Sequence, residues 1–438
     1  AGMGIVSGGV ADDSRQVQAG DLFLAYPGAL ADGRRYIGDA LARGAVAVLW
    51  QPGDDFAWSH DGPNFPVPAL RPLAGPLAHA VYGHPSEALS LIAITGTNGK
   101  TTISQCLARA YPKPCAIIGT LGAGFPEALT ETGFTTPEAT TLMRYLAQFR
   151  ARHAAACALE ASSIGIEEGR MNGARVDVAV FTNFTRDHLD YHGSMEAYAD
   201  AKEKLFHWPH LRTAVINVDD QLGRKLLRDT SALRVLGYGI GESRRDFHAV
   251  VRAEALTDLA HGQRFNLVLP NGRAVVETAL VGRYNVSNLL GVLASMRALG
   301  WSLQDAATAC GQIGAVPGRM EQVNRLLMPT TEGGCEQSGA PMPALPLVLV
   351  DYAHTPDALE KALQALQPLA SARGGQLHAV VGCGGDRDAT KRPLMAAAAE
   401  SSARHLCLTS DNPRSENPLA ILDRKSTRLN SVTPMYLV

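Results

Sequence analysis

The feature that most restricts the fold of this chain is a glycine-rich turn set between an apolar run and a helical pattern. Residues 89–94 are mostly apolar and predict a buried strand, residues 96–102 read GTNGKTT, and a helical pattern follows. In that order, backbone N–H groups and the start of a helix can surround phosphate oxygens. We therefore expect an α/β fold with a nucleotide-binding turn, in which Lys100 reaches the terminal phosphates and Thr101 holds Mg²⁺. The general P-loop pattern has a further glycine where Ile94 stands, so the match is partial.

Strand and helix patterns alternate along most of the 438 residues, a length that corresponds to about three domains. We predict a central doubly wound domain that carries the turn, an α/β domain before it and a Rossmann-like domain after it. A stretch rich in Gly, Pro, Ser and Thr, 324–345, is expected to be a linker or surface insertion. The predicted ranges are 1–88 for the first domain, 89–322 for the central domain, 323–423 for the third domain and 424–438 for a tail. Strands are expected at 22–26, 46–50, 176–184, 213–219, 346–352, 377–383 and 405–410.

The overall composition limits the classes of partner. The formal net charge is −2, so no broad electrostatic attraction draws the chain to nucleic acid or to an anionic membrane. No apolar run approaches the roughly 20 residues of a membrane-spanning helix, and the start shows no secretory signal. The seven cysteines are scattered without a metal-binding spacing, which indicates reduced thiols in a cytoplasmic protein. The chain begins AGMGIVSGG without an initiator Met, and we expect its N-terminus to be incomplete.

Seven further motifs accompany the turn and lead to a family resemblance. GTNGKTT resembles the ATP loop of the Mur ligases, the cytoplasmic enzymes that build the peptide of the bacterial cell-wall precursor. The resemblance covers all but the last fifteen residues and is strongest to the branch that joins meso-diaminopimelate to UDP-MurNAc-L-Ala-D-Glu. It implies an ATP-dependent ligase of peptidoglycan synthesis that acts, as a monomer, through an acyl-phosphate intermediate. The motifs that match in order are LEASSIGIEEGR (159–170), NFTRDHLDYHGSMEAYADAK (183–202), GRYNVSN (282–288), PGRME (317–321), DYAHTPDALEKAL (351–363), GCGGDRDATKRP (382–393) and DNPR (411–414).

The resemblance assigns roles around ATP. It implies two Mg²⁺ ions and a catalytic group that consists of Lys100, Glu160, His188 and Lys202, with Thr101 and a CO₂-derived carbamate on Lys202 among the metal ligands. Carbamate formation requires the neutral amine, so burial and nearby cations should favour the uncharged form of Lys202. Without the resemblance, Glu160 would cap a helix, His188 would sit in a polar turn and Lys202 would be a solvated surface residue. The implied ATP-binding residues are Gly96, Thr97, Asn98, Gly99, Lys100, Thr101, Thr102 and Arg319 for the phosphates, Asp351 for the ribose, and Asn285 and His354 near the adenine.

The resemblance also assigns the two substrates that are joined. For the UDP-sugar and its dipeptide it implies Ser14, the backbone of Ala29, Leu30 and Ala31, and the side chains of Thr135, Thr136, Ser163, Glu168 and Arg170. Glu168 stands where the family most often has glutamine, and Phe134 where it has asparagine. For diaminopimelate it implies Arg387, Asp411, Asn412, Pro413 and Arg414. Asp411 suits an ammonium group and Arg414 a bidentate grip on the second carboxylate, whereas relatives that add L-lysine lack DNPR.

Four alternatives stay open at this point: an L-lysine-adding ligase, a ligase of the folylpolyglutamate type, a P-loop kinase or motor ATPase, and an inactive fragment that only binds nucleotide. DNPR and the uridine-site motif argue against the folylpolyglutamate type, and a motor ATPase should show an apolar strand that ends in a metal-binding aspartate. From Arg424 the sequence departs from the family and offers neither apolar alternation nor a helical face. We therefore expect an incomplete, unstable third domain that binds diaminopimelate weakly.

Overall fold

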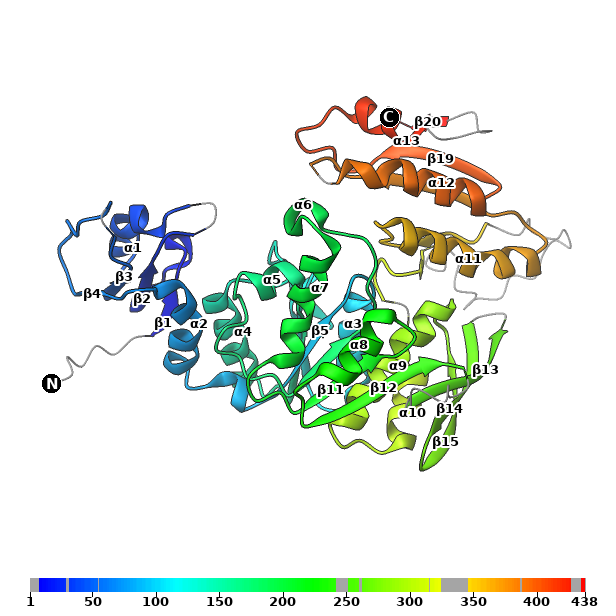
Figure 1. Cartoon of the computed structure of the whole chain (residues 1–438), viewed down its shortest axis with the longest axis horizontal. Helices are drawn as coiled ribbons and strands as arrows, with labels where there is room; N and C mark the ends of the chain where they lie inside the picture. Colours follow the sequence, from blue (N-terminus) through cyan, green and yellow to red (C-terminus); the bar gives the residue numbers. More distant parts are fainter. Residues whose placement is uncertain are drawn as a thin grey trace, which may run out of the picture. The chain divides into compact units, whose positions relative to one another are not determined.

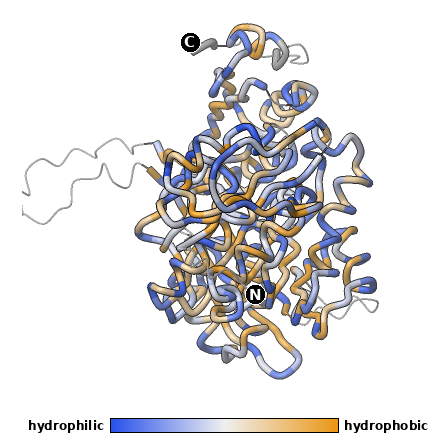
Figure 2. The backbone as a smooth tube through the Cα atoms, turned by 90° about the vertical axis from the view of Figure 1, so that its left-hand side faces the viewer, coloured by the Kyte–Doolittle hydropathy of each residue, from blue (hydrophilic) through white to orange (hydrophobic). Residues whose placement is uncertain are grey.

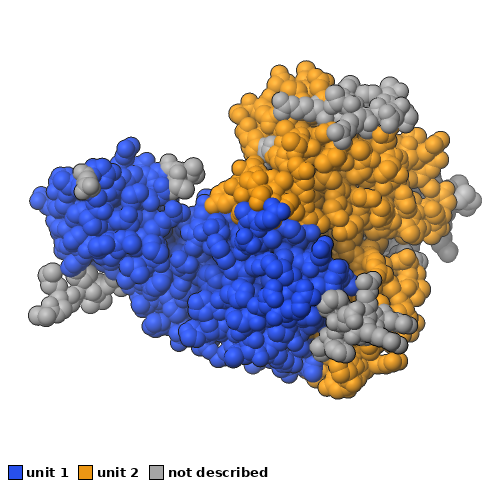
Figure 3. Space-filling model, viewed as in Figure 1, with its two compact units in different colours: residues 1–184, 196–238, 294–301 blue, residues 185–195, 239–293, 302–438 orange. Residues whose placement is uncertain are grey.

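The computed structural model describes residues 8–28, 31–53, 55–241, 251–259, 262–314, 316–323, 346–386, 388–426 and 435–437. The chain divides into two compact units (Figure 3). Unit 1 comprises residues 1–184, 196–238 and 294–301, and unit 2 comprises residues 185–195, 239–293 and 302–438. The predicted α/β class is confirmed, because helices and strands alternate through both units. The predicted domain boundaries stay a prediction.

A small parallel sheet opens unit 1 (Figure 1). Its strands have the same order across the sheet as along the chain: β1 (Gly9–Ala11), β2 (Asp21–Ala25), β3 (Ala47–Trp50) and β4 (Asn64–Pro66). Helix α1 (Ile37–Ala42) covers this sheet with Ile37 and Ala40, which pack in one cluster with Phe23 and Val48. Helix α2 (Leu70–Val81) follows and packs against α4 (Ala139–Ala151). The strands expected at 22–26 and 46–50 are therefore present as β2 and β3.

The larger sheet of unit 1 carries the glycine-rich turn. From β12 to β6 its strands are parallel, and β6, β7 and β8 run antiparallel to one another. The central strands are buried along almost their whole length, as expected for a parallel sheet covered on both faces. The order across the sheet is β12 (Arg234–Ile240, of which 234–238 belong to unit 1), β11 (Thr213–Asn217), β10 (Val178–Phe181), β5 (Ser90–Thr95), β9 (Ala156–Glu160), β6 (Cys115–Gly119), β7 (Gly122–Phe125) and β8 (Ala128–Thr130).

The chain changes direction across this sheet at β5. From β5 it continues to β6 on one side, returns to β9 next to β5, and then crosses to β10 on the other side. At such a point the connections leave the sheet on opposite sides and open a crevice at the carboxyl ends of the strands, where ligands bind in doubly wound proteins. The turn 96–99 follows β5, Glu160 ends β9 and Asn183 follows β10. The predicted doubly wound arrangement therefore places these three segments at one edge.

Unit 2 contains an antiparallel meander and a second α/β sheet. The meander consists of β13 (Val251–Leu259), β14 (Gly262–Leu269) and β15 (Gly272–Thr278), and α10 (Leu303–Gly311) packs on β15. The α/β sheet has the parallel order β18 (His378–Cys383), β19 (His405–Ser410) and β20 (Met435–Leu437). Its helices are α11 (Pro356–Ala372), α12 (Arg392–Ser402) and α13 (Pro418–Ser426). Leu363, Val381, Met395, Leu408 and Ile421 form the centre of its core.

Two expectations for the C-terminal part are wrong. The strand expected at 346–352 is reduced to β17 (Leu349–Val350), which pairs antiparallel with β16 (Glu321–Gln322) instead of joining β18. The segment instead forms backbone hydrogen bonds with residues 316–323. For example, the Tyr352 N–H donates to the Gly318 carbonyl at 2.9 Å. Regular structure also forms in the predicted tail, because α13 runs to Ser426 and β20 adds a parallel strand to β19. A strand of three residues is too short for alternation to reveal it. The predicted linker 324–345 lies outside the described residues.

Apolar residues are spread over many short stretches of the backbone (Figure 2). The largest buried cluster draws on strands and helices of unit 1 alike, including Leu91, Leu142, Leu159 and Phe181. In the described part of the chain, no helix combines the length and the apolar character that crossing a bilayer requires. Burial of this cluster packs helices of unit 1 on its larger sheet.

The buried cysteines give a test of the core of unit 1. Cys106, Cys115 and Cys157 are buried free thiols. Burial raises the pKa of Cys106 and of Cys115 to about 12 and also raises the pKa of Cys157. We expect iodoacetamide near pH 8 to leave all three unmodified in the folded protein and to alkylate them in urea, as measured by peptide mass mapping. Labelling of the folded protein at the rate seen for the less buried Cys407 would contradict this packing.

Candidate active site

The glycine-rich turn joins β5 to α3 (Lys100–Ala110) and has the shape that a phosphate site requires. Gly99 is the N-cap of α3 with φ 89°, in the left-handed region that favours glycine. At Gly96, a Cβ atom would collide with the Thr182 hydroxyl, so the turn passes too close to the end of β10 for any side chain. The first N–H groups of a helix have no partner within the helix and are suited to phosphate oxygens.

Two residues that follow β10 hold the turn. The Asn183 carbonyl accepts from Thr97 N–H at 2.8 Å, and its side-chain oxygen accepts from Asn98 N–H at 3.0 Å. The Asn183 amide group and the Thr182 hydroxyl both donate to the Asn98 carbonyl, at 3.0 Å and 2.6 Å. Sequence reasoning missed both residues. Their position directly after an apolar strand could have indicated that they lie near the turn. Their hydrogen bonds fix the backbone of the turn before any ligand binds.

Two predicted lysines meet at one carbonyl of the turn. Lys100 Nζ donates to the carbonyls of Gly96 and Thr97, both at 2.8 Å. Lys202 Nζ, on α7 (Met195–Glu203), donates to the same Gly96 carbonyl at 3.1 Å. The structure therefore brings Lys100 and Lys202, which are about a hundred residues apart in the sequence, to the phosphate turn.

Lys202 is not a surface residue. Its side chain is 1% exposed, and Nζ lies 4.3 Å from the centre of the Tyr198 ring. The Tyr198 hydroxyl is 3.2 Å from Thr97 Oγ1, so α7 contacts the turn through both side chains. A fully buried amine is the setting in which the uncharged form of lysine is favoured. These surroundings fit a lysine that reacts with CO₂, and the carbamate itself stays a prediction.

Glu160 is a buried carboxylate surrounded by donors. It ends β9 and is 1% exposed. Its Oε2 accepts from the hydroxyls of Thr101 and Thr120, each at 3.0 Å, and its Oε1 accepts from Ser104 Oγ and from the Thr120 N–H, each at 3.3 Å. These hydrogen bonds offset part of the cost of removing a negative charge from water. Sequence reasoning missed Ser104 and Thr120, although Ser104 lies one helical turn after Thr101.

The oxygen pair of Thr101 and Glu160 fits Mg²⁺. Neighbouring ligands of an octahedral Mg²⁺ ion with bonds of 2.0–2.1 Å are about 2.9 Å apart. Thr101 Oγ1 and Glu160 Oε2 are 3.0 Å apart, and both are hard oxygen ligands. On the neighbouring strand β6, a Cβ atom at Gly119 would collide with the Glu160 carboxylate, so glycine is needed for this close approach. The chemistry and the spacing of these donors therefore agree with the predicted ion.

The residues assigned to the muramoyl-dipeptide lie around the backbone of Glu160. Thr136 Oγ1 donates to the Glu160 carbonyl at 2.7 Å, and Thr135 Oγ1 is 3.1 Å from the Thr120 hydroxyl. Arg170 donates to the Thr136 carbonyl at 3.0 Å. Ser163, buried, is the first residue of α5 (Ser163–Glu167), seven residues before Arg170 in the chain. The structure thus links Thr135, Thr136 and Arg170 to Glu160 or to its hydrogen-bond partners.

Both departures from the family pattern contact Arg170. Glu168 accepts from Arg170 Nε at 2.8 Å, and the Phe134 ring centre lies 5.1 Å from the guanidinium carbon. Glu138, which sequence reasoning missed, is 3.2 Å from the same guanidinium. Burial raises the pKa of Glu138, and the charge of Arg170 opposes that rise. The two substitutions therefore act together on one cation.

The described residues assigned to the uridine end lie in the connections that follow β1 and β2 in unit 1. Ser14 is buried in the short helix Ser14–Gln16, and the Ala31 carbonyl accepts from Gly28 N–H at 2.8 Å. Ala29 and Leu30 lie outside the described residues. Asp12, which sequence reasoning missed, accepts from the Tyr26 hydroxyl and from Thr140 on α4, both at 2.7 Å. Asp12 thereby connects the small sheet to the helix that precedes β9.

In unit 2, His188 and His354 face one carboxylate. His188 is the N-cap of α6 (Leu189–His192), and its Nε2 lies 3.4 Å from Asp187 Oδ2. His354 Nε2 lies 3.6 Å from the same oxygen, and Lys391 Nζ lies 3.8 Å from Oδ1. Burial acts to raise the pKa of Asp187, but the His354 hydrogen bond and the nearby cations outweigh it and hold that pKa well below its usual range. Sequence reasoning missed Asp187 and Lys391.

The remaining nucleotide residues of unit 2 are also found in specific contacts. The Arg319 guanidinium lies 4.7 Å from the Tyr352 ring centre. Burial raises the pKa of Asp351, and the charge of Arg319 opposes this. Asn285, buried on α9 (Arg283–Ala298), donates to the Val281 carbonyl at 2.8 Å. Arg319 and Asp351 are thus neighbours, whereas the adenine role of Asn285 stays a prediction.

The DNPR motif follows β19 and folds onto the end of β18. Asp411 N–H bonds the Cys383 carbonyl at 3.4 Å, and Asn412 accepts from Gly385 N–H at 2.9 Å. Arg414 has φ 50° and donates to the Gly385 carbonyl at 2.6 Å. The Pro413 carbonyl lies so close to Gly385 that a Cβ atom on residue 385 would collide with it. Arg387 lies outside the described residues.

Comparisons with known proteins decide the family. Residues 8–73 match the Mur ligase family catalytic domain, residues 94–296 the Mur ligase middle domain and residues 341–433 the Mur ligase glutamate ligase domain. A UDP-N-acetylmuramoyl-L-alanyl-D-glutamate–2,6-diaminopimelate ligase from Chromobacterium violaceum is 48% identical over 94% of this chain and 80% of its own length. The chain belongs to the Mur ligase family. The third match also includes residues 424–433 of the predicted tail.

Solved structures agree with this assignment to the Mur ligases. A structure of a UDP-N-acetylmuramoyl-L-alanyl-D-glutamate–2,6-diaminopimelate ligase is 36% identical, covers 98% of this chain and 84% of its own, and has a TM-score of 0.69. A MurF ligase from Thermotoga maritima in complex with ADP shares the fold at 17% identity, with coverage of 98% and 93% and a TM-score of 0.62. The predicted ligase family and fold are confirmed.

Replacement of the buried carboxylate tests the metal site of this Mur ligase. We expect Glu160→Gln to lower kcat on the order of 100-fold, because a neutral amide binds Mg²⁺ poorly and less of the phosphate charge is then neutralised by the metal. Initial rates as a function of MgCl₂ concentration would measure this. The matched control is Glu167→Gln, which removes an exposed ion pair with Lys204 and should leave kcat unchanged. Wild-type kcat in Glu160→Gln would disprove the assignment.

Proposed function

We propose that the chain is an ATP-dependent ligase that joins meso-diaminopimelate to the dipeptide of UDP-MurNAc-L-Ala-D-Glu in the cytoplasm. The observation that carries the proposal is the oxygen pair of Thr101 and Glu160 at the phosphate turn, 3.0 Å apart and buried. The ligases named for this reaction that resemble the chain support the choice of substrates. The enzyme is expected to act as a monomer, as the family resemblance implies.

The chemistry needs a leaving group on a carboxylate. The dipeptide carboxylate attacks the terminal phosphorus of ATP, ADP departs, and an acyl phosphate forms. The amine of diaminopimelate then attacks the acyl carbon, so the amide bond forms as phosphate leaves. Mg²⁺, when bound, neutralises charge on the phosphate oxygens. Lys100 and the N–H groups at the start of α3 bind the same oxygens. Thr101 and Glu160 orient the phosphoryl group by holding the ion next to it.

The second metal site is assigned to His188 and to a carbamate on Lys202. A carbamate gives the buried Lys202 an anionic oxygen donor, which suits Mg²⁺ better than an amine does. His188 lies beside Asp187, whose carboxylate also contacts His354 and Lys391. That carboxylate orients the two imidazole rings and is a positioning residue for the site.

The lysine can be tested without assuming its modification. Lys202→Arg retains a long nitrogen-bearing side chain at this position, but a guanidinium cannot carry a carbamate. We expect this variant to bind ATP and to lose ligase activity, while wild-type activity falls in CO₂-free buffer and returns with bicarbonate. Rates with and without bicarbonate, together with the melting temperature of both proteins, would measure this. A variant as active as the wild type would rule out the carbamate.

Selection of diaminopimelate is assigned to DNPR. The guanidinium of Arg414 can pair with the second carboxylate of diaminopimelate, a group that L-lysine lacks. The binding of L-lysine would leave that cation without its partner, which costs binding energy. In the structure Arg414 donates to the Gly385 carbonyl, so the side chain is already directed over the ends of β18 and β19.

Product formation tests the proposed function as a whole. The chain, supplied with ATP and UDP-MurNAc-L-Ala-D-Glu, should form the tripeptide product with meso-diaminopimelate at a higher kcat/KM than with L-lysine. We expect Arg414→Ala to raise the KM for diaminopimelate at least about tenfold. Arg404→Ala, an exposed arginine just before β19, is the matched control and should not change KM. ATP hydrolysis without product, or a preference for L-lysine, would reject the proposed substrate.

A further inference from the structure

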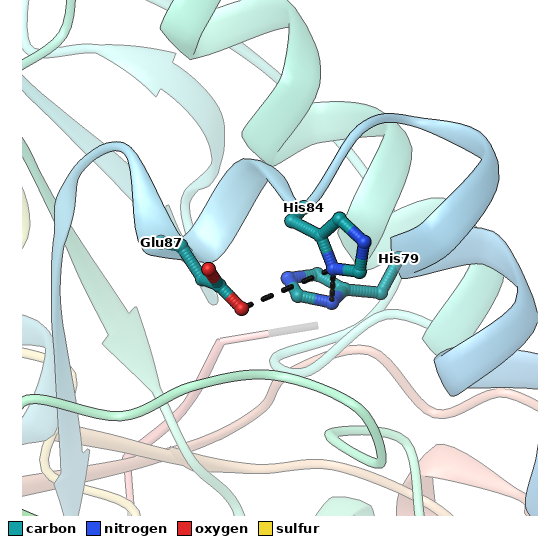
Figure 4. A group of neighbouring side chains, drawn as sticks. All are labelled: His79, His84 and Glu87. Carbon is teal, nitrogen blue, oxygen red and sulfur yellow. Dashed lines mark hydrogen bonds and ion pairs between the residues drawn. The ribbon is translucent and has the colours of Figure 1, made fainter.

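Two histidines and a glutamate converge where α2 ends (Figure 4). One ligand atom from each of His79, His84 and Glu87 lies within 4.8 Å of the other two. We propose that these three side chains bind a divalent transition-metal ion of the Zn²⁺ class. No role in binding ATP or either substrate is assigned to any of them, so this site is additional to the oxygen-rich site at Glu160.

The backbone brings the two imidazoles together through the way α2 terminates. Gly83 has φ 67°, its N–H bonds the Ala80 carbonyl at 3.0 Å, and the His84 N–H bonds the His79 carbonyl at 2.8 Å. This pair of hydrogen bonds is the Schellman motif, which places the third residue before the helix cap against the second residue after it. Those two positions usually hold apolar side chains in contact. Here both hold histidine.

The third ligand is supplied by the next turn. Pro85 opens the short helix η3 (Pro85–Glu87), and the Glu87 N–H bonds the His84 carbonyl at 3.1 Å. The chain thereby returns Glu87 to the side of His84, and Glu87 Oε1 lies 3.9 Å from His84 Nδ1. The sequence pattern is therefore H-x₄-H-x₂-E, with each interval set by a defined turn.

The distances suit a metal ion. His79 Nδ1 and His84 Nδ1 are 3.2 Å apart. Two nitrogen ligands of a tetrahedral Zn²⁺ ion with bonds of 2.0–2.1 Å would be about 3.3 Å apart. The Glu87 side chain is 52% exposed, and its carboxylate has room to turn toward the two ring nitrogens. Water can occupy the fourth position on the solvent side.

A buried serine orients the ring of His79. His79 Nε2 lies 2.8 Å from Ser86 Oγ, and the same oxygen accepts from the Arg175 N–H at 2.9 Å. When His79 Nε2 donates to Ser86, the Nδ1 atom carries no proton and its lone pair is available toward His84. A hydrogen bond to the second ring nitrogen fixes the tautomer of metal-binding histidines in the same way.

The ligand set selects the class of metal. Two imidazoles and one carboxylate suit Zn²⁺, Ni²⁺ or Cu²⁺, whereas Mg²⁺ prefers oxygen ligands alone. A bound ion would fasten the segment between α2 and β5, directly before the strand that carries the phosphate turn. Without an ion, the two Nδ1 atoms would share one proton in a hydrogen bond, and this is the competing explanation of their short distance.

Competition for Zn²⁺ with a chromophoric chelator tests the site in the full 438-residue chain. Millimolar MgCl₂ is included to fill the oxygen-rich site. The test variant is His84→Asn, because asparagine tolerates the left-handed backbone at φ 56° but has no imidazole. The matched control is His153→Asn, an exposed histidine with φ 61° at the end of α4. Glu87→Gln provides a second variant in an exposed position.

We expect the wild type and His153→Asn to bind one Zn²⁺ ion, and His84→Asn to bind it at least about tenfold more weakly. Glu87→Gln should also weaken binding. Co²⁺ should give the visible absorption of a tetrahedral site in the wild type and lose it in His84→Asn, while the melting temperatures without metal remain similar. Equal Zn²⁺ affinity in the wild type and in both test variants, or no Zn²⁺ bound by the wild type, would overturn the proposal in favour of a shared proton.

Discussion

The structure around the phosphate turn depends on one buried negative charge. Glu160 ends β9 inside the protein, and a carboxylate removed from water is stable only when several donors surround it. Thr101 and Ser104 from α3 and Thr120 after β6 supply those donors. Helix α3 and the end of β6 are therefore held to the same carboxylate, whose Oε2 is also the oxygen suited to Mg²⁺.

The position of Glu160 also explains how the peptide site is organised. Its backbone carbonyl accepts from Thr136, and the Thr136 carbonyl in turn accepts from Arg170. Two hydrogen bonds thus connect the backbone of Glu160 to Arg170, which is predicted to contact the dipeptide. Across the turn, Asn183 fixes Thr97 and Asn98, so the phosphate site is formed in advance. Such preorganisation lets interactions with phosphate favour the transition state instead of rearranging the protein.

The sequence predicted the parts that local pattern determines. Periodicity predicted the apolar strand before GTNGKTT and the alternation of strands and helices, and the glycines predicted the turn before α3. The resemblance located Glu160 and Lys202. The burial of Lys202 against Tyr198 depends on tertiary packing, and its helix looked like a solvated one. Asn183, Thr120 and Asp187 were missed because each contacts a functional residue that is distant in the sequence: Asn98, Glu160 and His354, respectively.

Two further differences have the same cause. The segment 346–352 looked like a central strand, yet it bonds residues 316–323, which no local pattern reveals. His79 and His84 stand five residues apart and lack the helical spacing of four, so only the Schellman geometry brings their rings together. Pairing of distant segments and the geometry of helix ends are the features that composition and periodicity do not encode.

The central claim is that ATP activates the dipeptide carboxylate at the site formed by Thr101 and Glu160. The most direct test is transfer of oxygen from a dipeptide whose reacting carboxylate carries ¹⁸O in both positions. If an acyl phosphate forms, the phosphate released during ligation contains one ¹⁸O atom and the new amide carbonyl retains the other. Mass spectrometry of the phosphate should show this label in proportion to product. Released phosphate without ¹⁸O, or label recovered in AMP, would contradict the account.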